Sequence, residues 1–409
     1  MIKKSKTKDI NIPFEKFPIA GIRLGIACAG IKKENHRDLV LIELTEGTKT
    51  AAVFTQNSFC AAPITLSKKH LSKAQPKYLL VNTGNANAGT GEQGLNDALT
   101  CCGMVADVTG VNISQVLPFS TGVIGEYLPV DKFSNAIQSA YSDLSENNWE
   151  NAAFGILTTD TRAKAFTRAI NLEGKTIRIS GIAKGSGMIR PDMATMLAYI
   201  ATDAKIEQTL LQSCLHEAVN YSFNRITVDG DTSTNDSAIL MATGKSDVEL
   251  KENSESLAEF QQTLTEVCEE LAKEMIRDGE GATKLITVAV TGCNSDEEAQ
   301  SVAYTVAHSP LVKTAFFASD PNWGRILAAV GRAGVIDFDL GKVNIALDDV
   351  SIVHNGEKSN DYTEERGQAV MDKSDITIHI DLARGNNEIK VWTCDFSYDY
   401  VRINAEYRT

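Results

Sequence analysis

One threonine in this sequence could become a nucleophile that carries its own base. Thr195 lies in the stretch Lys184-Gly-Ser-Gly-Met-Ile-Arg-Pro-Asp-Met-Ala-Thr-Met-Leu197. A cut between Ala194 and Thr195 would give the threonine a free α-amine beside its hydroxyl. The reference pKa of an α-amine is about 7.7–8.0, so much of it is neutral near working pH. One residue would then supply both the nucleophile and the general base. On composition alone, an ordinary strand threonine is the commoner interpretation.

The same stretch could produce the cut without a protease. The Thr195 hydroxyl can attack the Ala194 carbonyl, which gives an ester that water hydrolyses. Two glycines and a proline predict a loop between two strands. A phosphate-binding loop is rejected, because that motif places its lysine after the glycines, whereas Lys184 precedes them.

Hydrophobic periodicity places this loop among alternating strands and helices. Patterns typical of strands lie at residues 39–44, 78–82, 176–182, 376–380 and 389–392. Apolar residues at three-to-four spacing predict helices at residues 206–223, 257–276 and 297–306. Strands and helices in one intermixed order imply a layered α+β protein.

Composition limits the class of protein. The chain has 409 residues, of which 43% are hydrophobic and 23% charged, which is typical of a folded protein of about two to three domains. Its net charge of −13 disfavours nucleic acid and anionic membranes as partners. No apolar run approaches the roughly 20 residues of a membrane span, and the basic start lacks a signal-peptide core. A cytoplasmic location is therefore expected.

Cysteine and histidine spacing gives no sign of a metal centre. The eight cysteines form no CxxC pair and the six histidines no HxxxH or HExxH pattern, so we expect reduced thiols and no zinc site. Asp229, Asp231 and Asp236 form an acidic cluster that could suggest a hard cation. Its Asp-Gly, Asn, Ser and Thr neighbours favour a structural turn instead. Trp323 is interpreted first as a core residue.

Seven further segments accompany the threonine loop in a fixed order. They are Asn82-Thr-Gly-Asn-Ala-Asn-Ala, Ser120-Thr-Gly-Val-Ile-Gly, Thr158-Thr-Asp-Thr, Thr227-Val-Asp-Gly-Asp-Thr-Ser-Thr-Asn-Asp, Gly279-Glu-Gly-Ala-Thr-Lys, Ser319-Asp-Pro-Asn-Trp-Gly-Arg-Ile and Tyr400-Val-Arg-Ile-Asn-Ala-Glu-Tyr-Arg-Thr. With the loop, these segments resemble the ArgJ family, the ornithine acetyltransferases or glutamate N-acetyltransferases. The resemblance covers nearly the whole chain.

The resemblance implies a self-cleaving acetyltransferase of arginine biosynthesis. An α chain of residues 1–194 and a β chain of residues 195–409 would result, with Thr195 as the new N-terminus. The threonine would take the acetyl group of N-acetylornithine and pass it to glutamate in a ping-pong reaction. Acetyl-CoA is a further substrate if the enzyme also makes N-acetylglutamate directly, and no cofactor or metal is implied.

The resemblance also implies which residues form the site, because the family's site residues match positions of this sequence. The oxyanion hole maps to Thr121 and Gly122, which would otherwise be interpreted as a plain turn after residues 116–119. Substrate contacts map to Thr158, Lys184, Thr195, Glu280, Asn404 and Thr409. Lys184 suits a carboxylate and Glu280 an ammonium group, although surface charge is the simpler interpretation of both. Thr159 and Thr161 are alternatives to Thr158.

The resemblance also implies an ArgJ-like α/β/β/α sandwich with a smaller lobe in the β chain, and α2β2 assembly. Two other functions remain open. A self-processed aminopeptidase or amidase would use the same N-terminal threonine with water as the acceptor. A non-catalytic protein would bind acetylated amino acids without turning them over.

Overall fold

The chain forms two compact units, and each unit is built from three separate segments of the chain. The structure, a computed structural model, describes residues 13–172, 174–190 and 196–406. Unit 1 comprises Met1–Gly185, Asp192–Asn224 and Asp231–Met275, and unit 2 comprises Ser186–Pro191, Arg225–Gly230 and Ile276–Thr409. The predicted division at residues 194 and 195 therefore falls inside a segment of unit 1.

Unit 1 contains two main sheets. The first has the order β1-β2-β4-β5, with β1 (Ile22–Ala27), β2 (Leu39–Leu44), β4 (Tyr78–Asn85) and β5 (Val116–Val123). The second has the order β3-β10-β8-β7-β6, with β3 (Lys49–Phe54), β6 (Lys164–Leu172), β7 (Lys175–Lys184), β8 (Leu197–Thr202) and β10 (Ser237–Ala242). A small ladder pairs β9 (Lys205–Ile206) with β11 (Glu249–Leu250).

Period-2 alternation gives the first sheet two buried faces. On β2, Val40 and Ile42 point into the core that the two sheets share, whereas Leu39 and Leu41 point into a second core beneath helices. The helices of unit 1 are α1 (Ala62–Leu71), α2 (Gly91–Thr109), α3 (Phe133–Ser142), α4 (Trp149–Gly155), α5 (Gln208–Tyr221) and α6 (Glu255–Arg277).

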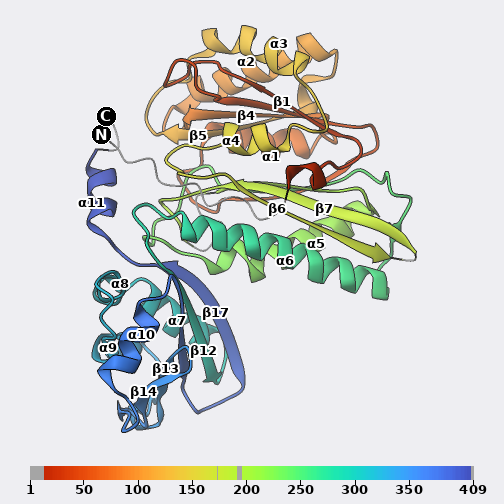
Figure 1. Cartoon of the computed structure of the whole chain (residues 1–409). Helices are drawn as coiled ribbons and strands as arrows, with labels where there is room; N and C mark the ends of the chain where they lie inside the picture. The colour runs from red at the N-terminus through yellow and green to blue at the C-terminus, as the bar shows by residue number, and fades with distance from the viewer. Residues whose placement is uncertain (1–12, 173, 191–195, 407–409) are drawn as a thin grey trace. The chain divides into compact units, whose positions relative to one another are not determined.

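Helices cover the outer faces of both sheets (Figure 1). Residues of α1, α2 and α3 complete the core on the first sheet, and α5 and α6 lie along the outer face of the second. The layer order is helix, sheet, sheet, helix, which confirms the expected α/β/β/α sandwich for this unit. Trp149 of α4 is buried within the core between the sheets.

The expected elements of unit 1 appear at their predicted positions, with boundaries that differ by up to three residues: β4 ends at Asn85 rather than at residue 82, and α5 ends at Tyr221 rather than at residue 223. The helix predicted from residue 206 begins instead at Gln208, because the Glu207 side chain caps it. Its carboxylate accepts the backbone N–H groups of Thr209 and Leu210, at 2.7 and 3.4 Å. Ile206 forms the last residue of β9.

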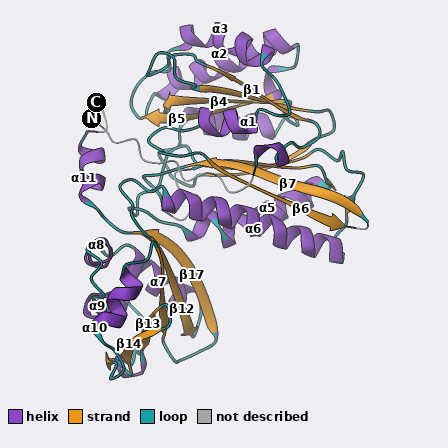
Figure 2. Cartoon of the chain, viewed as in Figure 1, coloured by secondary structure: helices purple, strands orange, loops and turns teal. Residues whose placement is uncertain are grey.

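Unit 2 is built on a six-stranded sheet with the order β15-β14-β13-β16-β12-β17. The strands are β12 (Leu285–Cys293), β13 (Asn344–Leu347), β14 (Val350–His354), β15 (Glu357–Lys358), β16 (Asp375–Asp381) and β17 (Asn387–Cys394). The helices are α7 (Asp296–Ala307), α8 (Pro310–Phe317), α9 (Trp323–Gly331), α10 (Glu364–Met371) and α11 (Tyr398–Ala405). Figure 2 shows this mixture of helices and strands.

Two details of unit 2 bear on the sequence predictions. The two last strands predicted from the sequence, β16 and β17, do not pair with each other, because β12 lies between them. Trp323 packs partly buried against the core of this unit, as expected.

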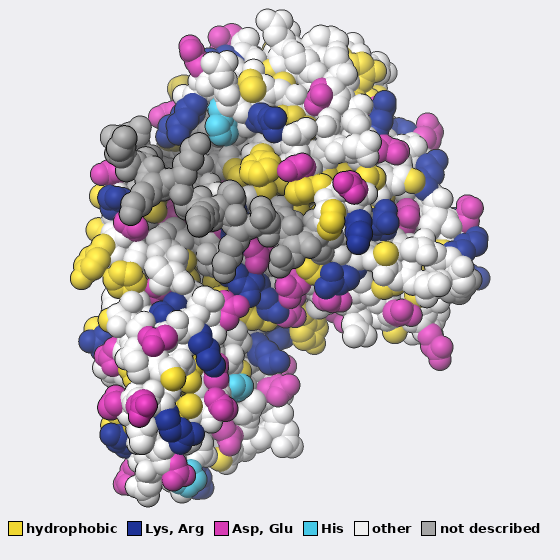
Figure 3. Space-filling model, viewed as in Figure 1, with side chains coloured by type: hydrophobic (Ala, Val, Ile, Leu, Met, Phe, Trp, Pro, Cys, Tyr) yellow, Lys and Arg dark blue, Asp and Glu magenta, His cyan; other side chains and the backbone are white. Residues whose placement is uncertain are grey.

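The surface carries both signs of charge. On the visible face of unit 2, basic and acidic side chains are intermixed (Figure 3). Ion pairs such as Lys373 with Asp348, whose Nζ and Oδ2 atoms lie 2.7 Å apart, occur in this unit. Exposed pairs of this kind contribute little to stability. Among the described residues, no helix has the length and hydropathy needed to cross a membrane.

Candidate functional site

The ends of three neighbouring strands lie side by side at one end of the second sheet of unit 1. Lys184, the last residue of β7, pairs with Leu197 of β8, which in turn pairs with Ser237 of β10. The segment predicted to form the threonine loop therefore begins and ends at this same end of the sheet. Ala194 and Thr195 lie outside the described residues, as does Thr409. Met196, which follows them, donates its N–H to Asp236 Oδ1 at 2.9 Å.

Thr121 and Gly122 lie near the end of β5 in the first sheet. The parallel register with β4 shifts here, because a bulge at Gly84 and Asn85 interrupts the ladder. Gly122 has a φ of +139°, and a Cβ on it would lie 2.2 Å from the Gly84 carbonyl carbon. Only glycine fits this close approach of two strands.

Hydrogen bonds hold the bulge in place. Asn82 Nδ2 donates to the Asn85 carbonyl at 3.0 Å, and Ser120 Oγ donates to Asn82 Oδ1 at 2.6 Å. Asn235, which precedes β10, donates through Nδ2 to the carbonyls of Ala86 and Ser120, at 2.7 and 2.9 Å. The amide of Asn235 thus joins the second sheet to the first beside Thr121.

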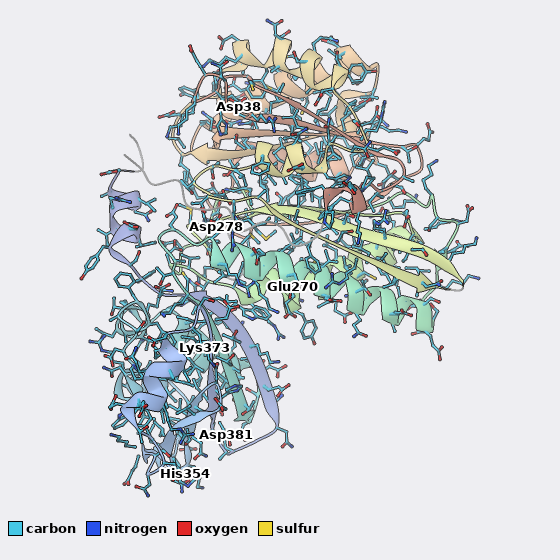
Figure 4. All side chains as sticks on the ribbon, viewed as in Figure 1. Asp38, Glu270, Asp278, His354, Lys373 and Asp381 are labelled. Atoms are coloured by element: carbon cyan, nitrogen blue, oxygen red, sulfur yellow. The ribbon has the colours of Figure 1, made fainter. Side chains whose placement is uncertain are left out.

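A buried aspartate supports the same bulge from β2. Asp38, labelled in Figure 4, accepts the N–H groups of Ala29 and Ile31 at 2.5 and 2.6 Å. Its own carbonyl accepts the Thr83 N–H at 2.9 Å. The loop that Asp38 closes packs against Gly84, because a Cβ there would lie 3.1 Å from Lys32 Cβ.

We expect Gly122→Ala to destabilise the fold. The substitution forces a Cβ into backbone atoms at a positive φ, and such strain costs about 1–3 kcal/mol. Gly125→Ala is the matched control, since Gly125 also has a positive φ of +84° but open space around its Cβ position. The melting temperature should fall further for Gly122→Ala than for Gly125→Ala. Equal shifts would show that the approach of β4 is not tight.

Lys184 reaches from the second sheet to Thr121. The lysine is only 4% exposed, and its Nζ donates to Thr121 Oγ1 at 3.0 Å. The hydroxyl oxygen must be the acceptor, because an ammonium group has donors only. The structure therefore brings together two residues, Thr121 and Lys184, that lie far apart in the sequence.

Asp160 is the buried counter-charge of this cluster. It lies in the loop before β6, and the antiparallel pairing of β6 with β7 places that loop beside the end of β7. Its carboxylate pairs with Lys164, and both side chains are fully buried. It also accepts the N–H groups of Gly185 and Thr158, at 2.8 and 3.1 Å.

Two opposing effects act on the pKa of Asp160. Burial raises it, but the positive charges of Lys164 and Lys184 and the hydrogen bonds from Lys164 and the Gly185 N–H outweigh burial. The pKa of Asp160 is therefore held well below its usual range, and the group is ionised. Thr158, the substrate contact of the prediction, is half-buried and held by this carboxylate, whereas Thr159 and Thr161 are exposed.

Acid should remove the stabilisation that Asp160 provides. In the unfolded chain its pKa is about 3.9, above the folded value. The contribution is thus present above about pH 4 and is lost as the pH falls toward the folded pKa. Asp160→Asn should lower the free energy of unfolding at pH 7 by about 3–5 kcal/mol, because Lys164 loses its buried partner.

Urea unfolding of wild type and Asp160→Asn between about pH 7 and pH 3 measures this effect. The two stability curves should converge as the pH falls, since only the wild type loses this carboxylate. Curves that stay parallel over the whole range would contradict the assignment.

The pKa of Asp236 is shifted in the opposite direction from that of Asp160. Its side chain is fully buried, and burial raises its pKa well above the ordinary value, although the Met196 N–H, Ser233 and Lys184 oppose the shift. Its Oδ2 has no hydrogen-bond partner within the described part of the chain. The protonated form of Asp236 is therefore favoured, which leaves Asp160 as the ionised aspartate beside Lys184.

Unit 2 carries its own polar cluster around Glu280. This largely buried glutamate accepts Asn404 Nδ2 at 2.8 Å through Oε2, and its N–H donates to the Ser186 carbonyl at 2.8 Å. A Cβ on Gly187 would lie 2.5 Å from the Glu280 carboxyl carbon. The second glycine of the Gly-Ser-Gly motif is thus required by the approach of this carboxylate.

Helix α11 reaches Glu280 because its first turn is fixed at Gly281. Ser397 Oγ donates to the Gly281 carbonyl at 2.6 Å, and Gly281 has a φ of +73° with the Tyr400 N–H group against it. From there the helix carries Asn404 to the carboxylate. The structure thereby unites Glu280 and Asn404, which the sequence placed 124 positions apart.

Asp229 and Asp236 of the acidic cluster accept backbone N–H groups. Asp229 accepts the N–H groups of Met188 and Ile189, at 2.7 and 2.9 Å, within unit 2. Asp236 belongs to unit 1. The two carboxylates each bind backbone N–H groups, and their roles are structural.

All eight cysteines are free thiols. Burial raises the pKa of Cys101 to about 12 and that of Cys214 to about 11. Such thiols are poor nucleophiles at neutral pH. Cys101 and Cys214 are therefore unsuited to nucleophilic catalysis.

Sequence reasoning missed Asp160 and Asn235. Both lie inside segments that were singled out, Thr158-Thr-Asp-Thr and the Thr-Asn-Asp end of the acidic segment. An aspartate beside three hydroxyl residues is usually a turn residue, so its type alone gave no signal of burial. Its partners are supplied by another strand, which the local sequence does not reveal.

Comparison with known proteins agrees with the resemblance. The ArgJ family model matches residues 23–409. The arginine biosynthesis bifunctional protein ArgJ of Pseudomonas fluorescens is 55% identical over 394 residues, which are 96% of this chain and 97% of that protein. The protein of the same name from Methylococcus capsulatus is 58% identical over 393 residues, covering 96% of each chain.

A crystal structure of the arginine biosynthesis bifunctional protein from Bacillus halodurans is 43% identical to this chain. It covers 50% of this chain and 95% of its own, with a TM-score of 0.48. Because the family model spans nearly the whole chain and relatives of almost full coverage share more than half of its residues, this chain belongs to the ArgJ family.

Proposed function

We propose that this chain is a self-cleaving acetyltransferase of arginine biosynthesis. It moves the acetyl group of N-acetylornithine to glutamate through an acetyl ester on Thr195. The observation that carries the proposal is the pair Thr121 and Gly122 beside a buried lysine, in a chain whose relatives are named arginine biosynthesis bifunctional proteins.

The first step is self-cleavage. The Thr195 hydroxyl attacks the Ala194 carbonyl, the C–N bond breaks, and the released nitrogen becomes the α-amine of Thr195. Water then hydrolyses the ester. The products are an α chain of residues 1–194 and a β chain of residues 195–409, which assemble as α2β2.

Acetyl transfer then uses the new N-terminus. The Thr195 amine takes the proton from its own hydroxyl as the oxygen attacks the acetyl carbonyl. The negative charge that forms on the carbonyl oxygen accepts hydrogen bonds from the Thr121 hydroxyl and the Gly122 N–H. Collapse breaks the C–N bond, and the amine returns the proton to the leaving nitrogen of ornithine.

Glutamate completes the cycle. Its neutral α-amine attacks the acetyl ester, a second tetrahedral oxyanion forms in the same hole, and Thr195 leaves with its proton restored. Two acyl-transfer steps with lower barriers thus replace one direct transfer of the acetyl group from the donor amide to the acceptor amine. No cofactor takes part, and acetyl-CoA is proposed as an alternative acetyl donor for direct synthesis of N-acetylglutamate.

The remaining polar residues are proposed to bind the amino-acid groups. Lys184 has an ammonium group suited to a carboxylate, and Glu280 has a carboxylate suited to the ammonium of ornithine. Thr158, Asn404 and Thr409 supply neutral or terminal hydrogen-bonding groups. A biosynthetic reaction on free amino acids is consistent with a cytoplasmic location.

The intact mass under denaturing conditions is the first test. Two polypeptides that sum to the chain plus one water, divided between Ala194 and Thr195, are expected. The processed protein is then incubated with N-acetylornithine, with and without glutamate. Release of ornithine should depend strongly on glutamate, with N-acetylglutamate as the second product.

The assay separates the competing functions. Release of ornithine and acetate without glutamate would indicate an amidase. Saturable binding without turnover would indicate a binding protein. Replacing N-acetylornithine by acetyl-CoA in the presence of glutamate tests the second activity.

A further inference from the structure

Four ionisable side chains are buried around Thr121 and the end of β7. Asp160 and Lys164 form a fully buried pair, and Lys184 is 4% exposed. The charge of Lys184 acts on Asp160 and also on Asp236. Burying so many charges is costly, because only well-placed pairs and hydrogen bonds offset the loss of water.

The donor and acceptor roles at Thr121 follow from chemistry. A hydroxyl has one proton and two lone pairs, and its proton rotates to suit its partners. Lys184 Nζ can only donate, so one lone pair of Thr121 Oγ1 is occupied. The hydroxyl proton then points away from Lys184 and can donate to a different acceptor. A hydroxyl held in this way is a permanent donor, which is what an oxyanion hole requires.

Lys184 is itself held by the residue that follows it. The N–H of Gly185 donates to Asp160 Oδ1 at 2.8 Å, which fixes the backbone at the end of β7. The charge of Asp160 also stabilises the buried ammonium of Lys184. Removal of that carboxylate would leave two buried ammonium groups to repel each other.

We propose that Asp160 is a positioning residue for the oxyanion hole, which acts by holding Lys184 against Thr121 so that the Thr121 hydroxyl donates to the oxyanion. This inference rests on the proposed acetyl transfer and deepens it. Asp160 does not touch the substrate in this role. Lys184 gains a second task, the orientation of a hydroxyl, beside its proposed contact with a carboxylate.

A double-mutant cycle between Asp160→Asn and Thr121→Ala tests the proposal. The asparagine keeps a carbonyl oxygen for the Gly185 N–H but removes the charge. In the wild-type background, kcat should fall about tenfold to a hundredfold, with KM changed less than about threefold. In the Thr121→Ala background, where the hydroxyl is absent, the same substitution should change kcat by less than about threefold.

Turnover is expressed per processed chain, as determined from the intact mass. An equal loss of kcat in both backgrounds would overturn the proposal, because Asp160 would then act independently of the Thr121 hydroxyl. A loss confined to KM would also overturn it and assign Asp160 to substrate binding. If wild type itself transfers no acetyl group, the proposed function fails and not this inference alone.

A second variant covers the case in which Asp160→Asn folds poorly. Asp160→Asn with Lys164→Met replaces both members of the buried pair, which often preserves stability. Lys184 still lacks its counter-charge, so kcat should remain as low as in the single variant. Recovery of wild-type turnover in the double variant would mean that Asp160 serves only to neutralise Lys164.

Asp203→Asn is the matched control, at a second aspartate that binds a backbone N–H of β7. Asp203 is partly buried and accepts the N–H of Arg178 of β7 at 2.9 Å, as Asp160 accepts that of Gly185. It has no part in the proposed site. The control should keep wild-type kcat, and a loss comparable to that of Asp160→Asn would show that any weakened β7 contact lowers turnover.

Discussion

Thr195→Ala should leave the protein as a single 44.3 kDa polypeptide without acetyltransferase activity. The substitution removes the hydroxyl that would attack the Ala194 carbonyl, so no α-amine is released. It also removes the atom that would carry the acetyl group. Both losses have one cause, and turnover should fall to the background rate of the uncatalysed exchange. Intact mass and the N-acetylornithine assay measure the two effects on one sample.

Thr195→Ser is the matched control, because serine keeps the hydroxyl and gives the same kind of N-terminus. It should still be cut and should retain measurable transfer. Wild-type turnover in Thr195→Ala would refute the proposed mechanism. Normal cleavage in Thr195→Ala would place the attacking group outside this residue.

Thr121→Ala should lower kcat by about 10²–10³, the typical effect of removing one donor from an oxyanion hole. The Gly122 N–H remains, so activity should not vanish. Thr121 is a buried strand residue, and its hydroxyl accepts a hydrogen bond from Lys184. Alanine keeps the strand backbone and fits the same space, so the fold should persist. Steady-state kinetics on the processed protein, with thermal melting beside it, separates the loss of a donor from a loss of structure.

Thr121→Ser restores the hydroxyl and should recover most of the turnover. An unchanged kcat in Thr121→Ala would remove this hydroxyl from the oxyanion hole. The proposal for Asp160 would then fail with it.

Local pattern was sufficient for most elements. Residues 39–44 form β2 because five apolar residues, interrupted only by Glu43, supply both faces of a doubly covered strand. Residues 257–276 lie within α6 because their apolar residues recur every three to four positions. These signals depend on neighbours in sequence. The start of α5 was placed two residues early, since the capping role of Glu207 depends on its side-chain rotamer.

The sequence by itself therefore determined the elements, the loop that carries Thr195 and, through eight ordered segments, the family. The tertiary structure alone decided which groups meet. The contact of Lys184 with Thr121 spans 63 positions, and that of Asp160 with Gly185 spans 25. The first contact arises because the two sheets of unit 1 pack against each other, and the second because the pairing of β6 with β7 places the loop before β6 beside the end of β7. Whether an aspartate is ionised in that setting depends on the burial and the lysines around it, and neither can be read from its neighbours in the chain.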